Sequence, residues 1–327
     1  MIDTVAVTFN LHPPQRAVIA DALGTAARPA WLSDLDDAGR VAALRDAVAI
    51  LARDTGKDLR PNEVRHIQSA RLIQFITAGI DFVPLNALPA GIPVASNGGA
   101  YAEPMAEHGL AMVLAASKRL LIEHAALARG EFNQHTRNRT LAGKVCGILG
   151  FGGIGVATAR LMRALGMRIH AINRRGRSDE PTDWIGSVSE LDLLLRAADV
   201  LIVSTPLTPA TKDLIGGREL GLMKPDAILV NLARGEIIQE APLFAHLQTH
   251  PGFSACIDAW WIEPVRHGAF RMDYPFLSLP NVIGSPHNSA SVPGMTEAAL
   301  RRAVGNIRRA LTGEAPHYVL APEERMN

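Results

Sequence analysis

Short apolar runs alternate with longer amphipathic stretches between about residues 143 and 287. The runs have four to six residues, are rich in Val and Ile, and lack a helical period, which is typical of strands buried on both faces of a parallel sheet. The predicted strands are Val145–Leu149, Met167–Ile172, Val200–Val203, Ala227–Asn231, Ser254–Asp258 and Val282–Ser285. Strands that alternate with crossover helices predict a doubly wound, Rossmann-type α/β domain.

The first hundred residues show the same alternation more weakly. They predict a second, smaller α/β domain of the flavodoxin-like type, with strands near Thr4–Phe9, Ala47–Leu51, Leu72–Thr77 and Ile92–Ala95. The chain is therefore expected to form the smaller domain from residues 1–98 and 289–327, and the larger one from residues 99–288.

Two further helices are predicted outside this alternation. Apolar residues recur at three- and four-residue spacing between Ala102 and Arg129, which predicts one long helix, and a second helix is expected at Met295–Leu311. The tail from Pro316 to Asn327 is largely polar and is expected to be frayed.

Composition and charge exclude several classes of protein. The formal net charge is +1, so there is no electrostatic reason to expect nucleic acid or an anionic membrane as a partner. No apolar run reaches the roughly 18 residues of a membrane span, and the start MIDTVAVTFN lacks the basic stretch of a secretory signal. Cys146 and Cys256 lie in apolar runs and are expected in the core, with the cytoplasm as the compartment. No metal site is predicted.

The segment Gly150-Phe151-Gly152-Gly153-Ile154-Gly155 has the glycine spacing of a dinucleotide-binding turn. A predicted strand runs into it and an amphipathic helix leaves it. Gly150 permits the tight turn, Gly152 lets a pyrophosphate approach the backbone, and Gly155 allows close packing of the helix on the strand. The free amides at the helix start face the negative charge of the phosphates. The turn therefore predicts a nicotinamide dinucleotide as cofactor.

The end of the second strand, about 20 residues beyond the glycine turn, usually discriminates NAD from NADP. A carboxylate there accepts hydrogen bonds from the adenosine ribose, but this sequence reads Asn173-Arg174-Arg175-Gly176-Arg177. Guanidinium groups suit a phosphate dianion, so NADP(H) is favoured and NAD(H) stays open. The alternative is that these arginines only form a solvated surface loop.

Five segments in order resemble the D-isomer-specific 2-hydroxyacid dehydrogenases, with glyoxylate and hydroxypyruvate reductases as the nearest type. They are Thr140–Gly150, Thr205–Thr211, Asn231–Glu240, Asp258–Pro264 and Pro280–His287. The resemblance implies that Arg234, Glu263 and His287 are catalytic. An always-charged guanidinium can hold a carboxylate and polarise a ketone, and an imidazole can donate the proton that the ketone oxygen needs. Glu263 would orient that imidazole and favour its charged form.

The resemblance also implies the remaining contacts. Cofactor contacts are expected from the amide of Ile154 to the pyrophosphate, from Thr205 and Pro206 on the adenosine side, from Ala233 beside the nicotinamide ring, and from Asp258 to its carboxamide. Gly153, Thr211 and Leu232 are further expected cofactor-binding residues. Ala78 and Gly79 match a loop whose amides hold the substrate carboxylate, and Asn97–Gly99 is the expected hinge. A homodimer through the helix that starts near Ala102 is implied as well.

Two departures from the family pattern put the substrate side chain in doubt. The connection between Glu263 and Tyr274 is longer than usual, and the paired Trp260 and Trp261 precede it. Rival readings stay open: formate dehydrogenases, which carry glutamine where Glu263 stands, phosphite dehydrogenases, and a nucleotide-sensing corepressor that mainly binds other proteins. The expected activity is hydride transfer between the cofactor and a small 2-oxo or 2-hydroxy acid.

Overall fold

The computed structural model describes residues 2–325. The described chain divides into two compact units, one running to Tyr101 and resuming at Val292, the other comprising Ala102–Ser291. The sequence places these boundaries after residues 98 and 288.

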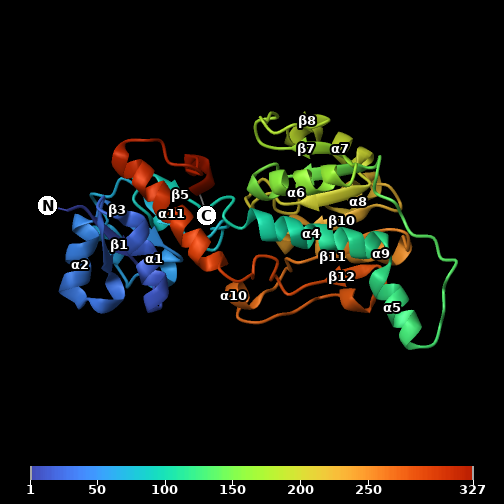
Figure 1. Ribbon diagram of the computed structural model, residues 1–327, viewed down its shortest axis with the longest axis horizontal. Coiled ribbons are helices and arrows are strands. Elements are labelled where there is room, and N and C mark those ends of the chain that lie inside the picture. Colours follow the sequence, from blue (N-terminus) through green and yellow to red (C-terminus); the bar gives the residue numbers. More distant parts are fainter. Residues whose placement is uncertain (1, 326–327) are drawn as a thin grey trace. The chain divides into compact units, whose positions relative to one another are not determined.

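The first unit is built on a five-stranded parallel sheet with strand order β2-β1-β3-β4-β5 (Figure 1). This is the flavodoxin-like order. Its strands are β1 (Thr4–Val7), β2 (Arg28–Trp31), β3 (Ala49–Ala52), β4 (Ile73–Phe75) and β5 (Val94–Ala95). Its helices are α1 (Pro13–Leu23), α2 (Asp37–Asp46), α3 (Thr55–Asp58) and α11 (Met295–Thr312). Two separate apolar clusters form the core, one with α2 and the other with α1 and α11.

The expectation that the tail is frayed is wrong for its described part. Backbone hydrogen bonds join Ser96 to Tyr318 at 3.1 Å and Leu320 to Val94 at 2.8 Å, so the tail continues the sheet beside β5 in antiparallel direction. Buried Asn306 on α11 accepts from the amide of His317 at 2.7 Å. Backbone groups make this pairing, so the polar composition of the tail did not indicate it. Residues 326 and 327 lie outside the described residues.

The second unit contains a seven-stranded parallel sheet with order β12-β11-β10-β9-β6-β7-β8 (Figure 1). It confirms the Rossmann-type domain. The strands are β6 (Val145–Leu149), β7 (Arg168–Ile172), β8 (Trp184–Gly186), β9 (Val200–Val203), β10 (Ile228–Asn231), β11 (Ser254–Ile257) and β12 (Val282–Gly284). The helices are α4 (Ala102–Ser117), α5 (Leu120–Ala128), α6 (Gly153–Ala164), α7 (Leu191–Ala197), α8 (Gly217–Leu222), α9 (Glu240–Thr249) and α10 (Pro264–His267).

The single helix predicted from Ala102 to Arg129 is wrong, because the structure breaks it into α4 and α5. Arg119 adopts a left-handed backbone conformation with φ of 53°, which ends one helix and starts the next in a new direction. Apolar spacing continues across the break, so the pattern could not reveal it. The segment after α5 extends away from the sheet (Figure 1).

Both cysteines belong to the strands of this second sheet. Cys146 on β6 and Cys256 on β11 are fully buried, and burial raises the pKa of each thiol to about 12. Among the described residues, no helix is both long and apolar enough to cross a membrane.

Candidate active site

The glycine turn lies at the carboxyl end of β6, the edge where ligands bind in open α/β sheets. Gly150 has φ of 104°, and a Cβ on it would stand 2.4 Å from the amide nitrogen of Thr205. A Cβ on Gly155 would stand 2.4 Å from the Gly150 oxygen, whereas one on Gly152 would meet no atom within 4 Å. Gly150 and Gly155 therefore lie where neighbouring backbone atoms leave no room for a side chain, and Gly152 leaves open space at the start of α6.

The loop after β9 lies against this turn. The Ser204 hydroxyl donates to the Gly150 carbonyl at 2.9 Å, which places Thr205 and Pro206 beside the glycines. Thr211 acts within the loop: its hydroxyl donates to the Pro206 carbonyl at 2.7 Å and accepts from the amide of Thr208 at 2.8 Å. The hydrogen bonds of Thr211 therefore stabilise the conformation of the loop.

Asn173 organises the turn at the end of β7, next to the glycine turn. Its side-chain oxygen accepts from the amide of Arg175 at 2.9 Å, and its side-chain nitrogen donates to the carbonyl of Arg177 at 2.9 Å. Arg174 and Arg175 are exposed. The turn thus places two exposed arginines where a carboxylate would face an adenosine ribose in an NAD site.

The Glu263 carboxylate and the His287 imidazole form a close pair. His287 Nδ1 lies 2.8 Å from each Glu263 oxygen, and the amide of Trp260 donates to Glu263 Oε1 at 2.7 Å. Glu263 is only 7% exposed. Burial alone would raise the pKa of this carboxyl, but the hydrogen bond and charge of His287, the Trp260 amide and the Arg234 charge outweigh burial and lower it.

An ionised carboxylate can only accept hydrogen bonds, so His287 Nδ1 carries a hydrogen and Nε2 is the nitrogen that remains for a substrate. His287 also has φ of 51°, in the left-handed region that non-glycine residues rarely adopt. Such conformations gather at active sites, where surrounding contacts hold them. Here the Glu263 pair is the contact that holds the ring.

Arg234 stands in the segment that leaves β10 at the same edge of the sheet. The Asn231 side chain fixes this segment, accepting from the amide of Ala233 at 3.0 Å and donating to the carbonyl of Arg234 at 2.8 Å. Leu232 and Ala233 are buried. Since the Arg234 charge contributes to the low pKa of Glu263, the structure brings all three predicted catalytic side chains into one electrostatic site.

Asp258 follows β11 at this edge and is fully buried. Its Oδ1 accepts from the Ser285 hydroxyl at 2.5 Å and from the amide of Asn288 at 3.2 Å. Its Oδ2 has no hydrogen-bond partner among the described residues. Ser285 in turn lies 2.9 Å from His108 Nε2 on α4. Ser285 lies within the segment Pro280–His287, but no motif includes His108, and 177 positions separate the two residues, so their contact was not predicted from the sequence.

Ala78 and Gly79 belong to the first unit, in the loop that follows β4, and are partly buried. In the same unit, the Asn97 side chain donates to the carbonyls of Ile76 and Ala299 at 3.1 and 2.9 Å. Gly98 lies so close to the Tyr318 ring that a Cβ would stand 2.2 Å from it. The expected hinge residues are therefore closely packed within their own unit.

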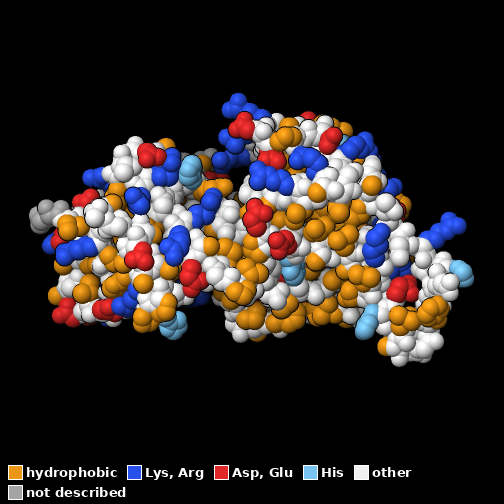
Figure 2. Space-filling view, in the orientation of Figure 1, with side chains coloured by type: hydrophobic (Ala, Val, Ile, Leu, Met, Phe, Trp, Pro, Cys, Tyr) orange, Lys and Arg blue, Asp and Glu red, His pale blue; other side chains and the backbone are white. Residues whose placement is uncertain are grey.

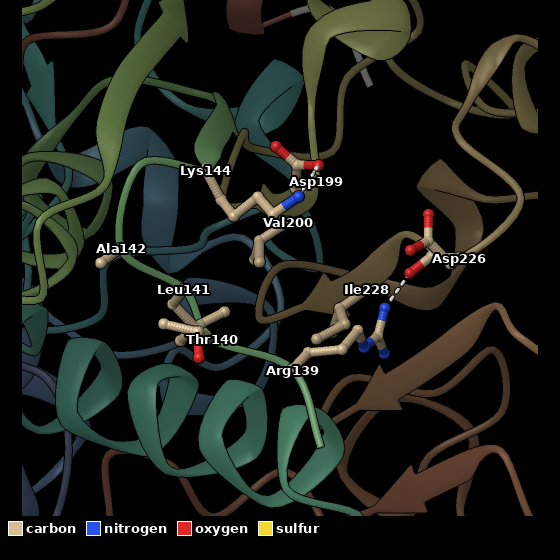
Figure 3. A pocket seen from close by; sticks show the side chains of 9 residues that line it. All are labelled: Arg139, Thr140, Leu141, Ala142, Lys144, Asp199, Val200, Asp226 and Ile228. Carbon is tan, nitrogen blue, oxygen red and sulfur yellow. Dashed lines mark hydrogen bonds and ion pairs between the residues drawn. The ribbon is translucent and has the colours of Figure 1, made fainter. Parts of the chain in front are cut away.

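A cavity of about 320 Å³ lies at the opposite, amino edge of the larger sheet, near the starts of β6, β9 and β10 (Figure 3). Three of its charged side chains have partners: Lys144 lies 4.0 Å from Asp199, and the Arg139 guanidinium donates to the backbone carbonyl of Asp226. It is separate from the candidate site, which occupies the carboxyl edge.

The residues at the carboxyl edge fit a nicotinamide dinucleotide. Gly152 leaves space for a pyrophosphate at the first amides of α6, which Gly153 and Ile154 provide. The buried Asp258 Oδ2 needs a donor, and a carboxamide N–H is a suitable one.

Comparison with known proteins identifies relatives of this chain. The sequence profile described as "D-isomer specific 2-hydroxyacid dehydrogenase, NAD binding domain" matches residues 110–289. Glyoxylate/hydroxypyruvate reductase B of Enterobacter agglomerans is 30% identical over 259 residues, covering 77% of this chain and 79% of the relative. D-3-phosphoglycerate dehydrogenase of Methanocaldococcus jannaschii is 29% identical over 86% of this chain, which spans about half, 54%, of that longer protein.

A solved structure from Pyrobaculum aerophilum, provisionally named a formate dehydrogenase, has a TM-score of 0.81 at 26% identity, covering 98% of this chain and 99% of that one. The fold and site define a dinucleotide-dependent oxidoreductase. The chain belongs to the D-isomer-specific 2-hydroxyacid dehydrogenase family, as its motifs predict.

Proposed function

We propose that this chain is a 2-oxo acid reductase that uses NADPH in preference to NADH and forms the D-hydroxy acid. The observation that carries the proposal is the ionised Glu263 held 2.8 Å from His287 Nδ1, beside the charge of Arg234. The bound nicotinamide supplies the hydride. The residues of the chain bind the acid, polarise its ketone and deliver the proton.

In this proposal Arg234 holds the substrate carboxylate and draws charge toward the ketone oxygen. As the hydride reaches the ketone carbon, negative charge develops on that oxygen, and His287 donates its Nε2 proton there. Glu263 keeps the ring oriented and stabilises its protonated form. In the reverse direction the neutral imidazole would take the hydroxyl proton, and the oxidised nicotinamide would accept the hydride from the substrate carbon.

We assign the dinucleotide to the larger domain, residues 99–288 in the sequence-based division, and a further contact to the substrate carboxylate, in addition to Arg234, to the smaller domain. The backbone amides of Ala78 and Gly79 would supply that anion site. Gly150, Gly155, Thr205 and Pro206 would form the phosphate and adenosine side of the cofactor site; the loop bonds of Thr211 support an indirect role for it.

Preference for NADPH rests on the turn that Asn173 organises. Replacing Arg174 and Arg175 together by serine removes two charges and should lower kcat/KM with NADPH by about one to two orders of magnitude, while kcat/KM with NADH changes little. Exposed Arg168 at the other end of β7 provides the matched control, Arg168→Ser. Wild-type efficiency with NADH equal to or above that with NADPH would refute the preference.

The substrate test is a panel of glyoxylate, hydroxypyruvate, pyruvate and bulkier 2-oxo acids, assayed with NADPH beside formate and phosphite with NADP⁺. Oxidation of NADPH by at least one 2-oxo acid is expected. Glu263 argues against formate, since formate enzymes carry glutamine there. Turnover with phosphite alone would identify the protein as a phosphite dehydrogenase instead. No turnover with any compound would favour a corepressor-like binding protein.

We further propose a homodimer and a cytoplasmic location. Exposed apolar side chains on α5 support the dimer: Leu120, Leu121 and Leu127 are each more than half exposed, and Figure 2 shows apolar side chains where α5 lies. The two buried, unpaired thiols are compatible with a reducing compartment. Light scattering of the wild type and of Leu121→Asp tests the dimer: a mass of one chain for the wild type would exclude it.

A further inference from the structure

Three side chains from three different elements form a hydrogen-bonded chain at the carboxyl edge of the larger sheet. His108 comes from α4, Ser285 follows β12, and Asp258 follows β11. His108 Nε2 lies 2.9 Å from the Ser285 hydroxyl oxygen, and that hydroxyl lies 2.5 Å from Asp258 Oδ1. His108 Nε2 is also 3.7 Å from the same Asp258 oxygen.

The direction of these hydrogen bonds follows from the number of available hydrogens. Ser285 has one hydroxyl hydrogen, and the short contact to a carboxylate oxygen uses it when Asp258 is ionised. The serine oxygen can then only accept from His108, so His108 carries a hydrogen on Nε2. The chain runs from His108 as donor, through Ser285, to Asp258.

The position of Ser285 is fixed by its backbone. Its amide donates to the carbonyl of Ile257 at 2.9 Å, and its carbonyl accepts from the Trp260 indole at 2.8 Å. The hydroxyl can still rotate about its own bond, because nothing in the backbone controls it. His108 occupies its acceptor side and thereby leaves the hydrogen to Asp258.

Asp258 is fully buried, and its other oxygen, Oδ2, is buried without a partner among the described residues. A buried carboxylate oxygen without a donor is costly, so a ligand donor there gains affinity. The orientation of the carboxylate decides whether Oδ2 can meet that donor. Ser285 and the Asn288 amide hold Oδ1 and therefore set this orientation.

We propose that His108 is a positioning residue for the cofactor: through Ser285 it fixes the Asp258 carboxylate so that Oδ2 accepts the nicotinamide carboxamide N–H. This rests on the proposed role of Asp258 in cofactor binding. His108 contacts neither substrate nor cofactor in this proposal, and its side chain is 27% exposed, so it can be replaced without leaving a fully buried cavity.

The test uses calorimetric dissociation constants for NADP⁺ and for its 3-acetylpyridine analogue, which lacks the amide hydrogens. NAD⁺ and its own analogue are measured in parallel. His108→Ala should weaken NADP⁺ binding about 3- to 10-fold, the value of one hydrogen bond, and change the analogue's constant by less than about 2-fold. Ser285→Ala should show the same selectivity, and His108→Gln, which keeps an N–H near the Nε2 position, should restore most of the affinity.

Exposed His124 on α5 provides the control variant, His124→Ala, which should affect neither ligand. The variant Asp258→Ala tests the carboxamide contact of Asp258 separately from the positioning role of His108. If Asp258→Ala is selective for the carboxamide but His108→Ala weakens both ligands equally or neither, the positioning role is overturned and the proposed function stands. If Asp258→Ala shows no selectivity, the carboxamide role of Asp258 fails, and the inference fails with it.

Discussion

Replacing Glu263 by glutamine removes one charge from the candidate site and keeps its shape. The amide oxygen can still accept from the Trp260 amide, which bonds Glu263 Oε1 at 2.7 Å. The variant loses the ionic partner of His287, whose Nδ1 has both carboxylate oxygens at 2.8 Å. A hydrogen bond to a charged partner contributes about 1.5–3 kcal/mol. Because Glu263 is only 7% exposed, whereas the His287 side chain is 32% exposed, solvent screens the pair in part, and the loss corresponds to a fall of about one to two orders of magnitude in kcat/KM.

The sign follows from the protonation that the reaction needs. In the proposed mechanism, reduction needs the protonated imidazole, which the carboxylate stabilises, so activity should be lost as pH rises. In Glu263→Gln that loss should occur at a lower pH than in the wild type, because the imidazolium loses its ionic partner. The assay is kcat/KM for 2-oxo acid reduction between pH 5 and 10, with cofactor affinity measured at each end. A pH profile that keeps its midpoint while kcat falls would refute the reasoning and leave Glu263 with a structural role.

Three further predictions concern single residues. His287→Gln should lower kcat by about two to four orders of magnitude with cofactor affinity retained, and unchanged turnover at neutral pH would remove His287 from the chemistry. Gly152→Ala should weaken cofactor binding at an unchanged melting temperature, whereas Gly155→Ala, whose Cβ would meet the turn at 2.4 Å, should lower the melting temperature; equal effects on stability would contradict the open space at Gly152. Burial lowers the pKa of His246 to about 4, so its neutral form favours folding above the unfolded value near 6.5, and this stability is lost as pH falls toward 4. After solvent screening the loss is about 1–2 kcal/mol; thermal melts at pH 7 and 5 should show less acid destabilisation in His246→Phe, and identical shifts would exclude this cause.

Much of the larger domain follows from the sequence because its central strands are buried on both faces. Strands β6, β9 and β10 are buried throughout and read as continuous apolar runs. The two missed strands, β2 and β8, lie at sheet edges, and their residues are mostly only partly buried. An edge strand carries no distinctive apolar run, so the apolar pattern of the sequence did not predict β2 or β8.

The candidate site divides in the same way. Glu263 and His287 are recognisable because each stands in a motif, and the structure places them in contact. The role of His108 could not be predicted from the sequence, because its hydrogen-bonded connection to Asp258 through Ser285 depends on how α4 packs near the ends of two strands. Local patterns specify elements and motifs, whereas such contacts arise only when distant elements pack.

The central claim is that the protein reduces a 2-oxo acid with hydride from NADPH, and that Arg234, Glu263 and His287 catalyse this reaction. The most direct measurement is the loss of NADPH absorbance with the panel of 2-oxo acids, followed by chiral analysis of the product. The proposal predicts oxidation of NADPH with at least one small 2-oxo acid and formation of the D-hydroxy acid, both abolished in His287→Gln. No oxidation of NADPH or NADH with any of these acids, by protein that binds the cofactor, would contradict it.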